Sequence, residues 1–161
     1  MKKYLLAINH AYLMFGVTIY VGVLWALHFF WYPSWEVMTV DTVQDHFINP
    51  TAAATDFFWI VVPIMFAANA VLIYKEWQTN MRWAAILAML CLLAASYVGQ
   101  QLIIPINELI AAGTVTANEL PAMLEDWMFY NDVRWLIMSA MWLIMMVYFY
   151  TKGSLISAID D

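Results

Sequence analysis

The sequence predicts an all-α fold, a four-helix bundle that spans a membrane and forms one domain over residues 1–161. Its composition is 65% hydrophobic and only 11% charged, with a mean hydropathy of +0.74, whereas soluble domains carry about 25% charged residues. Four apolar blocks cover residues 5–31, 51–74, 83–104 and 133–150. A helix needs about 20 such residues to cross about 30 Å of hydrocarbon. Each block is near or above that length.

The ends of the four predicted helices follow from local signals. The first block is too long for the apolar core of a signal peptide and shows no small-residue cleavage site. Asn49 and Pro50 are typical of a cap followed by proline at the first helical position, so the second helix should begin there. Pro105 should disturb the end of the third helix. Asn131 should cap the fourth, which places Arg134 in its first turn.

The two long connections, residues 32–56 and 105–132, are predicted to hold short helices lying over one mouth of the bundle. In the first connection, Asp41 and Gln44 have the spacing of a capping box. In the second, Asn118 can cap a segment that has Pro121 in its first turn and runs toward Trp127.

Charge predicts the orientation of the bundle. Five of the six basic residues, Lys2, Lys3, Lys75, Arg82 and Lys152, fall on the side of the termini. Positive charge marks the cytoplasmic side, so both termini should be inside, in a bacterial plasma membrane. The two outer connections carry most of the acids and give the net charge of −6. Nucleic acid is excluded as a partner because it needs a basic surface.

Arg134 is the only basic residue predicted on the outer side. A poorly solvated guanidinium at a membrane border costs several kcal/mol or more, so it needs a partner. Each predicted helix also carries a polar residue near its outer end: His28, Asp56, Gln101 beside Gln100, and Arg134. Because polar groups facing lipid are costly, these side chains are expected to converge inside the bundle.

Further polar residues, Asn107, Glu108 and Asn131, lie just beyond this ring. Structural roles remain open for several members. In a purely structural role, Asn131 would cap a helix. Arg134 would then either reach the lipid headgroups or pair with Asp56 or Glu108.

Two histidines allow a metal hypothesis. His28 and His46 could meet at the outer face beside a carboxylate, which would suit iron, copper or zinc, or they could hold a haem axially. No tight ligand spacing supports this hypothesis. Met138, Met141 and Met145 share one helix face, for which packing is favoured over copper binding.

A set of residues resembles the anthrone-oxygenase-like family of small four-helix membrane proteins. The set comprises Ile104-Pro105-Ile106-Asn107, then Trp127, Asn131, Val133 and Arg134, with Pro33 and Asn49-Pro50 in matching places. Named members of that family oxidise polycyclic anthrones to quinones with molecular oxygen. The resemblance implies Asn107, Trp127, Asn131 and Arg134 as site residues.

Taken together, these features favour an oxidoreductase or oxygenase-like membrane protein that binds a flat, apolar aromatic or quinone-like molecule at the outer mouth. Arg134 would stabilise phenolate or enolate charge, and Glu108 or Asp56 would act as the base. Asn107, Trp127, Asn131, Gln101 and His28 would contact the ligand. Two alternatives stay open: a non-catalytic subunit of a larger membrane complex or homo-oligomer, and a haem or metal electron carrier.

Overall fold

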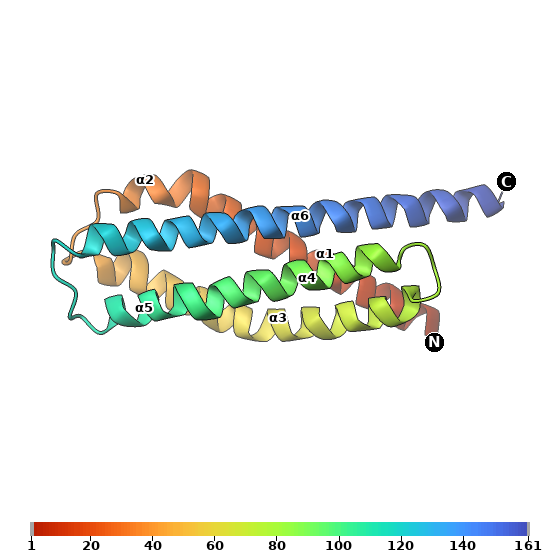
Figure 1. Ribbon diagram of the computed structural model, residues 1–161, viewed down its shortest axis with the longest axis horizontal. Coiled ribbons are helices and arrows are strands. Elements are labelled where there is room, and N and C mark those ends of the chain that lie inside the picture. Colours follow the sequence, from red (N-terminus) through yellow and green to blue (C-terminus); the bar gives the residue numbers. More distant parts are fainter. Residues whose placement is uncertain (1, 161) are drawn as a thin grey trace.

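The structure is a computed structural model that describes the backbone of residues 2–160 and the side chains of residues 4–153. Four long helices lie side by side, each long and apolar enough to cross a membrane. Both chain ends and the α3–α4 loop lie at one end of the bundle, which we call the termini end (Figure 1). The two longer connections lie at the opposite end, the connection end. The predicted all-α four-helix bundle is confirmed.

The elements follow one another without strands in the described residues. In chain order they are α1 (Lys2–Ala26), η1 (Leu27–Trp31), α2 (Tyr32–Trp35), η2 (Gln44–Ile48), α3 (Asn49–Glu76), α4 (Arg82–Val98), η3 (Gly99–Ile103), α5 (Ile104–Ala111) and α6 (Leu120–Asp160). The three η elements are π-helical turns that continue the neighbouring α-helices. The short helices α2 and α5 therefore extend the long helices, and do not lie across the mouth as expected.

Each π-turn stands immediately before a proline. The turns end at Trp31, Ile48 and Ile103, two residues before Pro33, Pro50 and Pro105. Proline lacks an N–H, and its ring clashes with the carbonyl four residues earlier in a regular α-helix. A wider turn, with bonds between residues i and i+5, moves that carbonyl away and lets the helix continue. The prolines thus widen these helices instead of ending them.

One carbonyl released in this way has a new partner. His46 lies four residues before Pro50, and its carbonyl oxygen accepts a hydrogen bond of 3.2 Å from the indole Nε1 of Trp35. Trp35 is buried against Phe47 and Trp127, with ring centroids at 5.2 and 5.0 Å. The bond therefore ties α2 to η2 and closes the first connection onto the bundle.

The largest departure from the predicted elements concerns the fourth helix. It was expected to begin near residue 133, but α6 begins at Leu120 and runs uninterrupted past Arg134. Arg134 consequently lies about 21 Å along the helix axis from its start, not in the first turn. Asn131 caps nothing. The start of the helix is held instead by Thr116, whose N–H and hydroxyl both donate to Glu119 Oε2.

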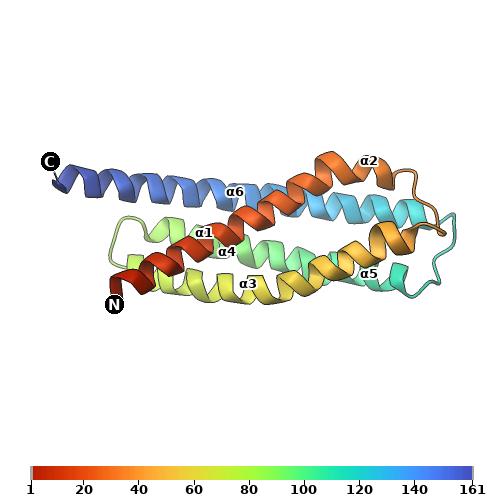
Figure 2. The same cartoon turned by 180° about the vertical axis from the view of Figure 1, so that it is seen from behind.

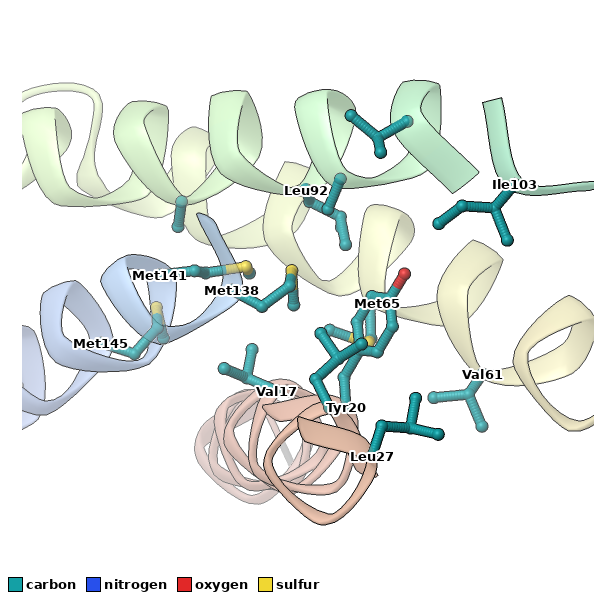
Figure 3. Packing of buried hydrophobic residues seen from close by; sticks show 14 of the residues in the cluster. Val17, Tyr20, Leu27, Val61, Met65, Leu92, Ile103, Met138, Met141 and Met145 are labelled. Carbon is teal, nitrogen blue, oxygen red and sulfur yellow. The ribbon is translucent and has the colours of Figure 1, made fainter. Parts of the chain in front are cut away.

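The core lies along the axis of the bundle. Met138, Met141 and Met145 of α6 are fully buried and pack toward Met65 and Leu92 (Figure 3), which agrees with the packing role predicted for this methionine face. Gly16 of α1 lies close enough to α3 that an added Cβ would stand 2.8 Å from Met65 Cγ. Close contact between α1 and α3 therefore depends on this glycine.

Helix α1 crosses the bundle obliquely (Figure 2). Toward the termini end it contacts α3, where Asn9 Nδ2 donates to the Ala68 carbonyl over 3.0 Å. Toward the connection end its continuation through η1 and α2 contacts α6, where His28 meets Asp132 and the Tyr32 hydroxyl donates to the Met128 carbonyl over 3.2 Å. A cavity lined by residues of α1, α3, α4 and α6 lies toward the connection end.

Candidate functional site

A cavity of about 720 Å³ occupies the connection half of the bundle. All four long helices contribute to its wall. Its polar lining comprises Tyr20, Asp45, His46, Thr51, Thr55, Ser96, Gln100, Asn107, Asn131 and Arg134, and its apolar lining includes Leu24, Leu27, Trp31, Phe58, Val62, Phe66, Ile103 and Trp127. This volume is within the range of about 300–1,000 Å³ that holds a small organic ligand.

Among the residues that the structure describes, Arg134 is the one Lys or Arg in the cavity wall. Its Nη1 donates to Asn131 Oδ1 over 3.0 Å, and its Nη2 donates to the Tyr20 hydroxyl. The guanidinium carbon also lies 5.2 Å from the centre of the Tyr20 ring, a cation–π distance. The Nε atom is buried and has no hydrogen-bond partner in the protein. The guanidinium is thus positioned by two neutral groups and keeps an unused donor.

No carboxylate neutralises this charge. Among the described side chains, the ion pairs are His28 with Asp132 and Lys152 with Glu76. Pairing of Arg134 with Asp56 or Glu108 was one expectation, and it is wrong for this structure. Both acids are exposed and neither lines the cavity, because their positions on α3 and α5 turn them outward.

Gly99 of the α4–η3 helix packs against Arg134, and Ser96 of the same helix lines the cavity. They are three residues apart and therefore share a helix face. A Cβ added to Gly99 would lie 3.6 Å from Arg134 Cζ, so the guanidinium packs directly on this backbone. Ser96 Oγ is buried in the cavity wall and, like Arg134 Nε, has no protein partner. Two unused polar atoms therefore belong to one cavity.

Three further residues predicted for the site do line the cavity, but they also bind one another. Trp127 Nε1 donates to Asn107 Oδ1 over 2.7 Å, and Asn131 Nδ2 donates to the Trp127 carbonyl over 3.0 Å. Trp127 and Asn131 are almost completely buried. The chain Asn107–Trp127–Asn131–Arg134 links α5 to α6 and holds the guanidinium in place.

His28 and Gln101 lie elsewhere. His28 Nδ1 is 2.8 Å from Asp132 Oδ1, and its ring stacks on Trp135 with centroids 4.7 Å apart and planes 11° apart. Neither His28 nor Gln101 lines the cavity, and Gln101 is exposed. The neighbouring Gln100 lines it instead, since the π-turn changes which residues of this helix face inward.

The residues do not fit the metal or haem hypothesis. His46 lies at the cavity rim beside Asp45, while His28 pairs with Asp132 on another face. No group of three His, Cys, Asp or Glu side chains that could hold a metal ion occurs in the described part of the chain. We therefore derive no chemistry from a bound metal.

Tyr20 and Gly99, which contact Arg134, and Ser96, which lines the same cavity, were not among the residues predicted for the site. They lie inside long apolar blocks, where a single hydroxyl or glycine gives no pattern. Only Ser96 and Gly99 could have been found from the sequence, because their spacing places them on the same helix face as buried Leu92 and Ala95.

A second polar cluster lies at the termini end. Glu76 is 5% exposed and accepts hydrogen bonds from Tyr148, over 2.9 Å, and from the Thr79 hydroxyl. Tyr148 binds Oε1, whereas the Thr79 hydroxyl and Lys152 Nζ, the latter at 2.9 Å, both bind Oε2. These contacts join the end of α3 to α6, and all partners belong to the protein.

Comparisons with known proteins found no similarity that identifies this chain: no family model matches the sequence, and no match was found among curated proteins or solved structures.

Proposed function

We propose that this chain is an integral membrane protein that binds an apolar, aromatic or quinone-like molecule in the cavity, with an oxygen atom of the ligand at Arg134. The observation that carries the proposal is the state of Arg134. Arg134 lines the cavity, its hydrogen bonds go to the uncharged side chains of Asn131 and Tyr20, and no carboxylate among the described side chains pairs with it. Such an arrangement is costly unless a ligand provides the missing contacts.

The walls of the cavity suit a flat ligand. Phe58, Phe66, Trp31 and Trp35 contribute rings to its lining, and aromatic rings bind flat molecules by stacking and edge contacts. Pocket walls that are mostly apolar, with a few polar groups at one place, are typical of small-molecule sites. In this arrangement Arg134 and Ser96 fix one end of the ligand, and the rings hold its body.

The cavity has a rim on the outer surface of the bundle. Trp59 and Pro63 of α3 line the cavity, and both are exposed. In the proposed setting, these residues face lipid, so an apolar ligand enters from within the bilayer. We place the helices in a bacterial plasma membrane with both termini in the cytoplasm, supported by Lys75, Arg82 and Lys152 at the termini end.

Catalysis has less support than binding. The residues assigned as bases, Glu108 and Asp56, do not line the cavity. The lining side chains that could act as a base are Asp45 and His46, and both are exposed at the rim. Oxidation of the ligand stays a prediction from the family resemblance, and so does membership of a larger membrane complex.

The proposal is tested by filling the cavity. Ala54 lines it, whereas its neighbour Ala53 is exposed and does not. The purified protein in nanodiscs is titrated with a naphthoquinone bearing an alkyl chain, and quenching of tryptophan fluorescence is followed. We expect saturable quenching in the parent protein and in Ala53→Phe, and its loss in Ala54→Phe. Equal, saturable quenching in all three proteins would show that the quinone binds elsewhere.

A further inference from the structure

We infer that the ligand is an anion, the conjugate base of an amphiphilic weak oxygen acid such as a phenol or a carboxylic acid, which supplies the countercharge of Arg134. This inference rests on the proposed binding function and specifies its ligand class. It goes beyond an oxygen contact, because a neutral quinone or ether would leave the charge of the guanidinium uncompensated.

The first argument is the charge balance around the cavity. A buried charge is tolerated when it is paired. The groups of the lining that could carry charge, other than Arg134, are Tyr20, Asp45 and His46. Tyr20 acts as a neutral acceptor for Arg134. Asp45 is exposed at the rim and forms no ion pair with Arg134 within the described structure. Asp132, two positions from Arg134 on α6, pairs with His28, so no carboxylate among the described side chains forms an ion pair with the guanidinium.

The second argument is the geometry of the unused donors. A guanidinium has five N–H donors, and hydrogen bonds to Asn131 and Tyr20 engage one on each of its two terminal nitrogens. Each terminal nitrogen keeps a second N–H, and Ser96, in the wall of the same cavity, carries a hydroxyl without a protein partner. A carboxylate or phenolate oxygen accepts several such bonds at once, and charge-assisted bonds of this kind are about twice as strong as neutral ones.

The third argument limits the number of charges on the ligand. The cavity wall holds a single Lys or Arg, and beyond Ser96 the lining is largely aliphatic and aromatic, including Leu24, Phe58 and Val62. A dianion such as a phosphate monoester would bring a second charge into apolar surroundings. The ligand class is therefore a monoanion with an apolar body.

The inference is tested with a probe that reports its own protonation state. A 2-nitrophenol carrying an alkyl chain is bound to the protein in nanodiscs, and the yellow phenolate band is titrated against pH. Because an opposite charge at about 4–6 Å favours the ionised form, the apparent pKa of the bound probe should fall by about one pH unit or more relative to probe in empty nanodiscs. Competition by dodecanoate should be at least about tenfold stronger than competition by dodecanol.

The matched variants are Arg134→Gln and Arg82→Gln. Arg82 is exposed at the start of α4, away from the cavity, so Arg82→Gln should behave as the parent protein. Arg134→Gln should still bind the probe, with the pKa returned to its value in empty nanodiscs and dodecanoate no longer preferred. A probe that binds the parent protein with an unshifted or raised pKa would overturn the inference while leaving the binding function intact. Failure of the quinone and of every probe to bind would overturn both.

Discussion

Tyr148 donates its hydroxyl hydrogen to Glu76 Oε1 over 2.9 Å, and so joins the last turns of α3 to α6. The same carboxylate binds Lys152 Nζ at 2.9 Å and the Thr79 hydroxyl. Tyr148 and Glu76 are both buried, with 1% and 5% of their surface exposed. A buried carboxylate is stable only when its oxygens are well satisfied, so these contacts hold the termini end together while the connection end surrounds the cavity.

Replacing Tyr148 by Phe should destabilise the fold. The change removes one hydrogen bond to a charged acceptor, which is worth about 1.5–3 kcal/mol. The midpoint of thermal unfolding in detergent measures the effect. Tyr150→Phe is the matched control, because Tyr150 is 80% exposed on the same helix. Equal midpoints for the two variants would mean that the Tyr148 hydroxyl contributes nothing to stability.

Gly16→Ala and Gly22→Ala should have opposite effects. Alanine is favoured over glycine inside a helix by about 0.5–1 kcal/mol. At Gly22 nothing lies within 4 Å of the added Cβ, so this gain should appear in full as a higher unfolding midpoint. At Gly16 the Cβ would stand 2.8 Å from both Cγ and Sδ of Met65. Overpacking of this kind costs about 1–3 kcal/mol, so the midpoint should fall.

The Gly16 effect should depend on Met65. In a Met65→Ala background the two clashing atoms are absent, so Gly16→Ala should no longer be destabilising there. A double-mutant cycle measures this coupling. If Gly16→Ala costs the same in both backgrounds, the close contact between α1 and α3 is not its cause.

Trp127→Phe should weaken both stability and ligand binding. The indole N–H donates to Asn107 Oδ1 over 2.7 Å, and the ring packs on Trp35 and Phe47. Loss of this bond, together with the smaller ring, should cost about 2–3 kcal/mol. Trp77→Phe is the control, since Trp77 is 53% exposed at the termini end. Because the Trp127 side chain lines the cavity and Trp77 does not, affinity for the quinone should fall more than in the Trp77 variant.

The prediction of the fold from sequence succeeded where the signal is local. The apolar blocks gave the four helices, and α3 begins at Asn49 as expected, although its cap residue is Ile48 and not Asn49. The prolines were misleading as boundary signals, because a π-turn before each of Pro33, Pro50 and Pro105 lets the helix continue. The start of α6 was missed because Glu125 and Asp126 interrupt its hydropathy, although Leu120, Leu124, Trp127 and Asn131 form a buried helical face.

The candidate site was predicted only in part for a related reason. Arg134 stands out in the sequence because a charge in an apolar block has few possible roles. Its partners do not stand out. Tyr20 lies on another helix, 114 positions away in the sequence, and which face of α1 meets α6 depends on the packing of all four helices. The acids Asp56 and Glu108 were expected as partners because they lie at a similar depth along the bundle as Arg134. Depth alone, however, does not determine whether a residue is on the inner or the outer side of its helix.

The start of α6 provides a prediction about pH. The Thr116 hydroxyl, and then its backbone N–H, donate to Glu119 Oε2 over 2.7 and 3.0 Å and hold the pKa of this carboxyl below its ordinary value of 4.5. Because the folded pKa is the lower one, the carboxylate stabilises the helix start above the unfolded pKa, and this contribution is lost as the pH falls through the folded pKa. Carbon-detected NMR titration of labelled Glu119 measures the pKa directly. Thr116→Val should raise it toward 4.5, because the hydroxyl donor is lost, whereas Thr114→Val, two residues earlier in the same connection, should leave it unchanged. An equal pKa in the parent protein and in Thr116→Val would show that the hydroxyl does not bind the carboxylate in solution.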